Sequence, residues 1–252
     1  MERWTGRVAI VTGASSGIGA ATAKKMVQAG MRVVGVARRE DKIKSLAAEL
    51  KSEKGQLFAM ACDVTKEEDI KRVVKWTRDV LGGADVLVNN AGVWYQAPFL
   101  ESNGELLRKM IDTNMWGLIM FIKEVTLDIR ERGVSDGHIV NIASIAGHRL
   151  LNCPGIGAYC ATKHGVTVIS EALRQELRDL GTRIRVTNIS PGVVKTDLFS
   201  ALEQNQARAQ EMFQVNPHLH PEDIADGIIY ALSTPPHVQV QEITIEPVGE
   251  KI

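Results

Sequence analysis

Short apolar runs alternate with longer amphipathic stretches along almost the whole chain, and this alternation limits the folds open to it. The runs expected to form strands are 8–11, 32–36, 57–61, 85–88, 138–142, 185–189 and 238–245. The stretches expected to form helices are 17–29, 41–53, 66–81, 103–113, 116–131, 158–180 and 221–232. Buried strands separated by helices form a parallel sheet covered on both faces, with right-handed crossovers. We therefore predict one α/β domain over residues 1–252, with a doubly wound parallel sheet and helices on both faces.

Charge and composition argue against several classes of function. The 30 basic side chains balance 30 acidic ones, so no net charge attracts nucleic acid or an anionic membrane. No apolar stretch is long enough to span a bilayer, and no charged segment followed by an apolar one opens the chain. Three cysteines without paired zinc spacing suit a reducing compartment. We expect a cytoplasmic protein with no metal, and we interpret His218 and His220 as loop residues.

A glycine-rich segment stands between the first predicted strand and the first predicted helix. It reads Gly13-Ala14-Ser15-Ser16-Gly17-Ile18-Gly19, a G-x-x-x-G-x-G spacing. Glycines at such a turn let the backbone approach a pyrophosphate, and the helix N-terminus directs free N–H groups and partial positive charge at it. A glycine-bearing turn occurs in many α/β proteins, but this position favours a dinucleotide site of the Rossmann type.

The end of the second strand indicates which dinucleotide is bound. In a Rossmann-type sheet this position lies beside the adenosine ribose, where NAD enzymes usually carry Asp or Glu. Here it holds Arg38 and Arg39. A carboxylate repels a 2′-phosphate, whereas an arginine binds one through charge-assisted hydrogen bonds. The sequence therefore favours NADP(H), with Arg38 as the main ligand and Arg39 or Lys42 as helpers; the alternative is a solvated basic turn.

Residues after the third and fourth strands fall at the same edge of the sheet. Asp63 is expected to accept from the adenine amino group, and Val64 to pack on the ring. Asn90, Ala91 and Gly92 allow the backbone to lie beside the adenosine. Asn89 has two equally supported interpretations, a ligand or a tie within the sheet.

Tyr159 and Lys163 are four positions apart at the start of a long predicted helix, so they share one face. A free tyrosine has a pKa of about 10, and a nearby ammonium group lowers it toward that of a useful base. Y-x-x-x-K alone is a weak pattern that surface helices often carry. Ser144 strengthens it, because this residue follows the strand that ends at the same edge and can hydrogen-bond a substrate oxygen. Asn114 falls mid-helix, where a side-chain amide is suited to binding water.

Taken together, these motifs resemble the short-chain dehydrogenase/reductase family over nearly the whole chain. The motifs are the glycine segment, 89–92, Asn114, Ser144, Tyr159, Lys163, and the run Pro191-Gly192-Val193-Val194-Lys195-Thr196. The resemblance implies a sheet of about seven strands and a catalytic tetrad of Asn114, Ser144, Tyr159 and Lys163. It also implies that Lys163 binds the nicotinamide ribose, that Pro191, Gly192, Val194 and Thr196 line the nicotinamide, and that the chain forms a homodimer or homotetramer through helices 116–131 and 158–180.

One departure concerns the substrate side. Ser144 and Tyr159 are 15 positions apart, longer than the commonest family spacing, and the extra residues fall in 147–154. The run 146–149, together with 193–196, is similar to the branch that includes insect NADP-dependent farnesol dehydrogenases and vertebrate dehydrogenase/reductase member 11, a ketosteroid reductase. His148 in this loop either contacts the substrate or makes a loop hydrogen bond.

Apolar residues around the predicted mouth favour an apolar alcohol or ketone as substrate. Trp94, Leu151 and Phe199 are the candidate contacts, beside Ser144 and Tyr159. The segment 198–216 does not fit the alternation and is predicted to act as a mobile lid over the nicotinamide. The preferred function is hydride transfer between NADP(H) and an apolar alcohol or carbonyl, with a terpenoid alcohol such as farnesol as the candidate substrate. The alternatives are a ketosteroid or general carbonyl reductase, a sugar-nucleotide epimerase or dehydratase of the extended family, which would need a larger C-terminal region, and a non-catalytic nucleotide sensor.

Overall fold

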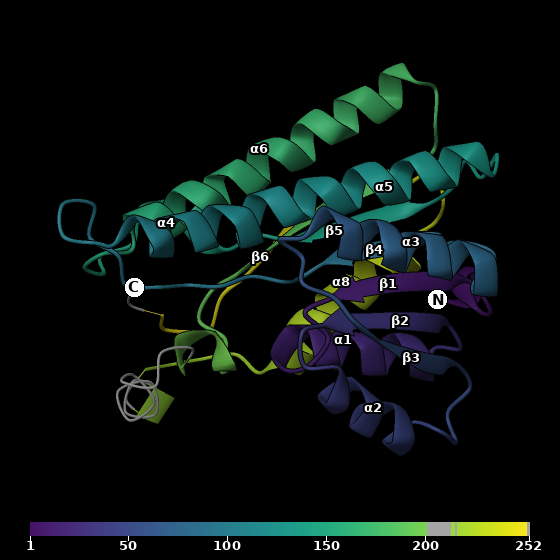
Figure 1. Ribbon diagram of the computed structural model, residues 1–252, viewed down its shortest axis with the longest axis horizontal. Coiled ribbons are helices and arrows are strands. Elements are labelled where there is room, and N and C mark those ends of the chain that lie inside the picture. Colours follow the sequence, from purple (N-terminus) through teal and green to yellow (C-terminus); the bar gives the residue numbers. More distant parts are fainter. Residues whose placement is uncertain (201–212, 215, 251–252) are drawn as a thin grey trace.

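A seven-stranded parallel sheet forms the centre of the molecule (Figure 1). The computed structural model describes residues 1–200, 213–214 and 216–250, without the side chains of residues 199 and 200. The strands are β1 (Val8–Thr12), β2 (Arg32–Ala37), β3 (Gln56–Ala61), β4 (Val86–Asn89), β5 (His138–Ile142), β6 (Arg185–Pro191) and β7 (Glu242–Ile245). Their order is β3-β2-β1-β4-β5-β6-β7, and every neighbouring pair is parallel. The predicted doubly wound α/β fold is confirmed.

Helices cover both faces of this sheet, as Figure 1 shows. One face carries α1 (Gly17–Gln28), α2 (Glu40–Glu49) and α8 (Pro221–Ser233); the other carries α3 (Glu67–Leu81), α5 (Gly117–Glu131) and α6 (Gly157–Asp179), with α4 (Gly104–Ile111) beside the start of α6. Short turns η1 (Glu2–Trp4), η2 (Asp112–Trp116), η3 (Ile145–Gly147) and η4 (Asp197–Ser200) complete the described elements. Among the described residues, no helix combines the length and the apolar character that a membrane span requires.

The strands are apolar throughout because both of their faces are buried. All five residues of β1 are buried, and they alternate between two cores. Ile10 packs toward Phe121 and the α3–α5–α6 layer, whereas Val11 packs toward Met26 and the α1–α2–α8 layer. Packing between the two helical layers fixes the position of each strand, and thus the positions of the loops that follow the strands.

Two predicted elements are shorter than expected. The helix predicted over 41–53 ends at Glu49, and residues 51–55 form a turn into β3. The strand predicted over 238–245 pairs only from Glu242. The reason lies in Gln239, whose side-chain amide accepts from the Val186 N–H (3.3 Å) and donates to the Val186 carbonyl (2.5 Å). This amide takes the place of a backbone partner for Val186, and backbone pairing with β6 begins where the Asn188 N–H donates to the Gln241 carbonyl (2.9 Å).

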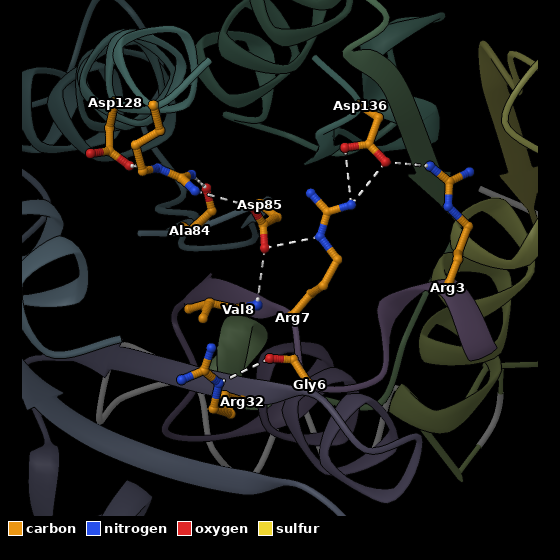
Figure 2. A network of polar contacts seen from close by, with 10 residues as sticks. Arg3, Gly6, Arg7, Val8, Arg32, Ala84, Asp85, Asp128 and Asp136 are labelled. Atoms are coloured by element: carbon orange, nitrogen blue, oxygen red, sulfur yellow. Dashed lines mark hydrogen bonds and ion pairs between the residues drawn. The ribbon is translucent and has the colours of Figure 1, made fainter. Parts of the chain in front are cut away.

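Charged side chains join the amino ends of three strands (Figure 2). Arg7, just before β1, contacts Asp85 before β4 (Nε to Oδ2, 3.0 Å) and Asp136 before β5 (Nη1 to Oδ2, 2.9 Å). Arg132 contacts Asp85 (3.3 Å) and Asp128 (2.9 Å). Hydrogen bonds from Arg7 lower the pKa of Asp136. This edge of the sheet is therefore held by ion pairs among its own residues.

Candidate active site

The carboxyl ends of the strands form the opposite edge, which Figure 1 shows at the left, with the C-terminus and the start of α6. The order of the strands reverses between β1 and β4, because β1 leads toward β2 on one side and β4 continues on the other. Ligands of open α/β sheets bind in the crevice at this switch point. The glycine segment follows β1 and residues 90–92 follow β4, so the fold brings both predicted nucleotide segments to that crevice.

The glycines are required by close backbone approaches in this crevice. Gly13 and Gly17 have φ values of +68° and +56°, a conformation that disfavours other residues. A Cβ added at Gly19 would collide with the carbonyl of Gly13 and with the Asn90 amide. The α1 N-terminus receives no side-chain cap from Ser16. A pyrophosphate suits this glycine cradle, residues 13–19, because the N-terminus of α1 offers uncapped N–H groups and partial positive charge at the switch point.

Thr12 and Asn90 fasten the two sides of the crevice together. The Thr12 hydroxyl accepts from the N–H groups of Asn90 and Ala91, each at 2.9 Å. The Asn90 amide donates to the Thr12 carbonyl at 2.9 Å. Asn90 is thus occupied in holding the loop, and its expected contact with the cofactor remains a prediction. Sequence reasoning did not single out Thr12, because a threonine that ends a strand carries no distinctive signal.

Asn89, whose role the sequence left open, ties neighbouring strands. Its amide donates to the side-chain Oδ1 of Asn141 in β5 at 3.0 Å, and the Asn141 amide in turn donates to the Ser170 hydroxyl of α6 at 2.9 Å. These buried side chains are joined to one another inside the core, and the Asn89 Oδ1 is the one oxygen among them without a partner in the described residues. The structure therefore supports the interpretation of Asn89 as a tie within the sheet.

Arg38 and Arg39 are both exposed at the end of β2. Arg39 donates to the hydroxyls of Ser15 (3.3 Å) and Ser16 (3.1 Å) and lies 3.7 Å from the Asp197 carboxylate. Arg38 has neither a hydrogen bond nor an ion pair with any residue that the structure describes. Two cations beside the glycine cradle, one of them unengaged, form a basic site suited to a phosphate.

Asp63 and Val64, the residues after β3, make most of their contacts with nearby residues. Asp63 accepts from the Thr65 N–H (3.0 Å) and the Thr65 hydroxyl (2.8 Å). Val64 packs against Gly117 at the start of α5, where an added Cβ would collide with it. Both residues lie at the carboxyl edge as predicted from the sequence, and their expected contacts with adenine remain predictions.

Three of the predicted catalytic side chains converge at the ends of β5 and β6. Ser144 begins the turn η3, where its hydroxyl accepts from the Ala146 N–H (3.1 Å) and donates to the Pro191 carbonyl (3.4 Å). The Tyr159 phenol lies near Ser144, whose hydroxyl acts to lower the pKa of the phenol. Lys163 donates to the Ile142 carbonyl at 2.9 Å, with Nζ 5.7 Å from the centroid of the Tyr159 ring. All three side chains are buried.

The electrostatics of this group differ from the sequence-based expectation. Burial raises the pKa of Tyr159 to about 12, and the Ser144 hydroxyl only partly opposes this. Burial also lowers the pKa of Lys163 to about 8. The prediction that Lys163 lowers the pKa of the phenol is thus wrong for the protein without ligand. Helical spacing predicts that Tyr159 and Lys163 lie close together, but it does not predict how deeply they are buried. Burial is the largest influence on both pKa values.

Asn114 lies in a different local structure from the helix expected of it. Residues Asp112–Trp116 form a π-helical turn between α4 and α5, in place of the break predicted between two separate helices. The amide of Asn114 accepts from the Val93 N–H (2.8 Å) and donates to the Val93 carbonyl (2.9 Å) and to Thr162 (3.1 Å). Its side chain therefore holds the loop after β4 against α6, and its expected role in binding water remains a prediction.

The Pro191–Thr196 loop runs from β6 across the crevice toward α1. The Gly192 N–H donates to the Ile245 carbonyl (2.8 Å), and Val194 pairs with Leu219. Thr196 contacts Gly17, since a Cβ added at Gly17 would lie 3.1 Å from the Thr196 methyl. The loop thus links Ser144 to the glycine cradle, the two parts of the site that a bound dinucleotide would bridge.

Apolar side chains pack around Tyr159. Tyr159 belongs to a small core with Ala97, Met110, Ala146, Ile156 and Cys160, against which Val93, Trp94, Tyr95, Leu107 and Leu151 pack half-buried. The predicted substrate contacts Trp94 and Leu151 are among these residues. The side chain of Phe199 and most of the predicted lid at 198–216 lie outside the described residues.

Comparison with known proteins gives the class. A sequence model of the family described as short chain dehydrogenase matches residues 7–207. The chain belongs to this family, and the fold and the site define it as an oxidoreductase. Among relatives, it is 49% identical to the farnesol dehydrogenase of Aedes aegypti over 100% of both chains, and 45% identical to dehydrogenase/reductase SDR family member 11 of Gallus gallus over 98% of both. Its structure matches the closed form of a serine dehydrogenase complexed with NADP⁺, with a TM-score of 0.88, 30% identity and coverage of 97% and 96%.

Proposed function

We propose that the protein is an NADP(H)-dependent oxidoreductase that interconverts an apolar alcohol, such as a terpenoid alcohol, and its carbonyl. One arrangement carries the proposal. Ser144, Tyr159 and Lys163 are buried together, the Pro191–Thr196 loop links them to the glycine cradle, and apolar side chains pack around Tyr159. The cradle and the basic pair at the end of β2 suit a phosphorylated dinucleotide. The identity to a farnesol dehydrogenase along the whole chain supports a terpenoid alcohol as substrate.

The proposed mechanism assigns one step to each buried group. The nicotinamide, when bound, gives or takes the hydride. Tyr159 donates a proton to the substrate oxygen during reduction and removes it during oxidation. Ser144, which already lies near the phenol, orients the same oxygen by a hydrogen bond. The apolar side chains around Tyr159 exclude water from this oxygen, and the exclusion of water strengthens each of these polar contacts.

Lys163 has two proposed tasks. Its ammonium group is held at the Ile142 carbonyl in the protein without ligand, next to the phenol. A hydrogen bond to the nicotinamide ribose would favour the charged amine, and the charged amine would then favour the phenolate. Asn114 is proposed to support a water that carries the proton to solvent, while its amide keeps the loop after β4 in place.

The test measures NADPH consumption with a panel of apolar carbonyls, and NADP⁺ reduction with the matching alcohols. The panel contains farnesal and farnesol, a ketosteroid pair and a simple quinone, each with both NADP(H) and NAD(H). We expect the highest kcat/KM with the terpenoid pair and NADP(H). Preferred turnover of the ketosteroid would replace the terpenoid assignment, and binding of NADPH without turnover of any compound would favour a nucleotide sensor.

We further propose that the chain forms a homodimer or homotetramer through α5 and α6. Several apolar side chains of these helices are exposed in the single chain: Trp116, Ile119, Leu127, Val168 and Leu180. Contiguous exposed apolar residues on a soluble monomer often mark an interface. Light scattering at micromolar concentration tests this, and a monomeric mass would contradict it.

A further inference from the structure

The C-terminal segment from β7 onward contacts both loops of the catalytic group through carboxylates. Glu242 and Glu246 contact His148 and Arg149 in the loop that follows Ser144. Glu250 contacts the loop that follows β6. These three residues are spaced four positions apart, and none of them was singled out by the sequence. Their contacts give the C-terminal segment a place in the site beyond its role as an edge strand.

Glu242 is the centre of a hydrogen-bonded cluster. Its Oε1 accepts from the Asn188 amide (2.9 Å) and the Ser190 hydroxyl (2.8 Å), and lies 2.7 Å from His148 Nε2. His148 Nε2 also lies 3.0 Å from the Ser190 oxygen. The single Ser190 proton goes to Glu242, so His148 Nε2 must carry the proton that faces both oxygens. Of the two interpretations of His148, the structure therefore supports a hydrogen bond that anchors the loop.

This cluster fixes the chain on either side of the catalytic serine. His148 is four residues after Ser144, and Ser190 directly precedes Pro191, whose carbonyl accepts from Ser144 at 3.4 Å. Asn188 and Ser190 are almost fully buried in β6. The anchor is thus rigid on the β6 side, and it holds the loop from 145 to 149 against β6 and β7.

Glu250 holds the neighbouring loop. Its Oε2 accepts from the Val193 N–H at 3.4 Å, and a Cβ added at Gly192 would collide with the same carboxylate. Its Oε1 is buried and has no partner among the described residues. Burial raises the pKa of Glu250, and the hydrogen bond from Val193 opposes this. A half-buried carboxylate that lies against the Cα of Gly192 limits the movement of Pro191–Val193.

We propose that Glu242 and Glu250 are positioning residues that hold the loops 145–149 and 191–193 at the separation required by the substrate and the nicotinamide. The inference rests on the proposed function for the identity of these ligands. The ion pair of Glu246 with Arg149 belongs to the same segment, but both partners are half-exposed. Glu242 is about as exposed as Glu246, but it alone also accepts from the buried Asn188 and Ser190, so the proposal concerns Glu242 and not Glu246.

The first experiment is hydrogen exchange by mass spectrometry on the free protein, with peptides resolving residues 145–151 and 192–198. Glu242→Ala is expected to accelerate exchange in the first peptide only, and Glu250→Ala in the second only. Each acceleration should be about tenfold, the loss expected for one hydrogen bond to a charged group. Glu222→Ala removes an exposed carboxylate from the first turn of α8 and is the control, with no change expected in either peptide.

Function is measured on the same variants. Glu250→Ala should raise the Kd for NADPH about tenfold in a fluorescence titration, whereas Glu242→Ala should mainly raise the KM of the alcohol. Glu250→Gln keeps an acceptor for Val193 and should restore both NADPH affinity and exchange. If an alanine variant does not fold, Glu250→Asp, which is too short to reach Val193, replaces it with the same expectation.

Gly192→Ala gives an independent check, because the added methyl group would push the Glu250 carboxylate from its seat. Its effect on NADPH affinity should therefore not add to that of Glu250→Ala. Unchanged exchange in both peptides would overturn the proposal. So would faster exchange with unaltered NADPH affinity and KM. Because exchange and NADPH binding need no turnover, the proposal can fail while the oxidoreductase function stands, and the reverse also holds.

Discussion

The two edges of the sheet use polar side chains in opposite ways. At the amino edge, Arg7 and Arg132 are paired with carboxylates of neighbouring loops, so charge is balanced within the protein (Figure 2). At the carboxyl edge, charge pairs also occur, at Arg39 and His148, but the residues assigned to the chemistry are held differently. Lys163 bonds to a backbone carbonyl, Asn114 bonds to Val93 and Thr162, and Arg38 has no partner among the described residues. Both sets of loops flank the same seven strands, one set before the strands and the other after them.

This difference separates stability from function. Removing one partner of a buried ion pair lowers the stability of the fold strongly, because the remaining charge stays buried without a partner. A cation or amine held only by a carbonyl retains most of its capacity to bind an anion or a ribose hydroxyl. We therefore expect substitutions at the amino edge to change the free energy of unfolding and leave catalysis intact, and those at the carboxyl edge to do the reverse.

The largest effect is expected from Tyr159→Phe, which removes the transferable proton and keeps the ring. Loss of a general acid–base group typically costs about 10²- to 10⁴-fold in rate, so kcat should fall by about 10³-fold. The Kd for NADPH and the midpoint of urea unfolding should change little. Retention of substantial turnover in this variant would show that another group carries the proton.

Arg7→Met tests the amino edge. It leaves Asp136 with only the longer contact to Arg3 (3.4 Å) and deprives the buried Asp85 of one of its cations. Breaking a buried ion pair from one side should lower the free energy of unfolding by about 3 kcal/mol, measured by urea titration. Lys75→Met, which breaks an exposed pair with Asp79, is the control and should have little effect. A matching fall in kcat/KM of the folded Arg7→Met protein would contradict the separation of the edges.

Arg38→Asp tests the carboxyl edge without touching the acid–base group. It replaces a cation suited to the 2′-phosphate with a charge that repels it. We expect kcat/KM with NADPH to fall about tenfold to a hundredfold, and that with NADH to rise, in steady-state assays. The same charge change at Lys51, in the turn after α2, should leave the cofactor preference unaltered. Equal efficiency with NADPH and NADH in the unaltered protein would remove the role assigned to Arg38.

The smallest effect concerns the ionisation of Tyr159. Burial raises the pKa of its phenol to about 12 in the free protein, so the group stays protonated at neutral pH. The positive nicotinamide of NADP⁺ and a charged Lys163 should lower the pKa of this phenol by at least about one unit in the complex. Alcohol oxidation, which needs the phenolate, should rise with pH toward the phenol pKa of the NADP⁺ complex, and carbonyl reduction should fall above the phenol pKa of the NADPH complex, where the nicotinamide is uncharged. Phenolate absorbance of the free and NADP⁺-bound protein, with Tyr159→Phe subtracted, provides the measurement.

Much of this edge was predictable from residue order. The alternation of apolar runs gave the sheet, and the positions of the glycine segment, Ser144 and Tyr159 after β1, β5 and their loops gave the site. Other features depend on contacts between distant parts of the chain. Gln239 shortens β7 by bonding Val186, and Glu250 lies on Gly192, 58 positions earlier. No local pattern marks such residues, and spacing alone could not reveal the desolvation of Tyr159.

The central claim is that the carboxyl edge transfers a hydride between NADP(H) and an apolar carbonyl. Reduction of farnesal with NADPH deuterated at both C4 positions tests it most directly, with mass spectrometry of the alcohol formed. We predict farnesol with one deuterium on the carbinol carbon in the unaltered protein, and almost none formed by Tyr159→Phe. Alcohol without deuterium, or no reduction of any carbonyl in the panel despite NADPH binding, would contradict the account.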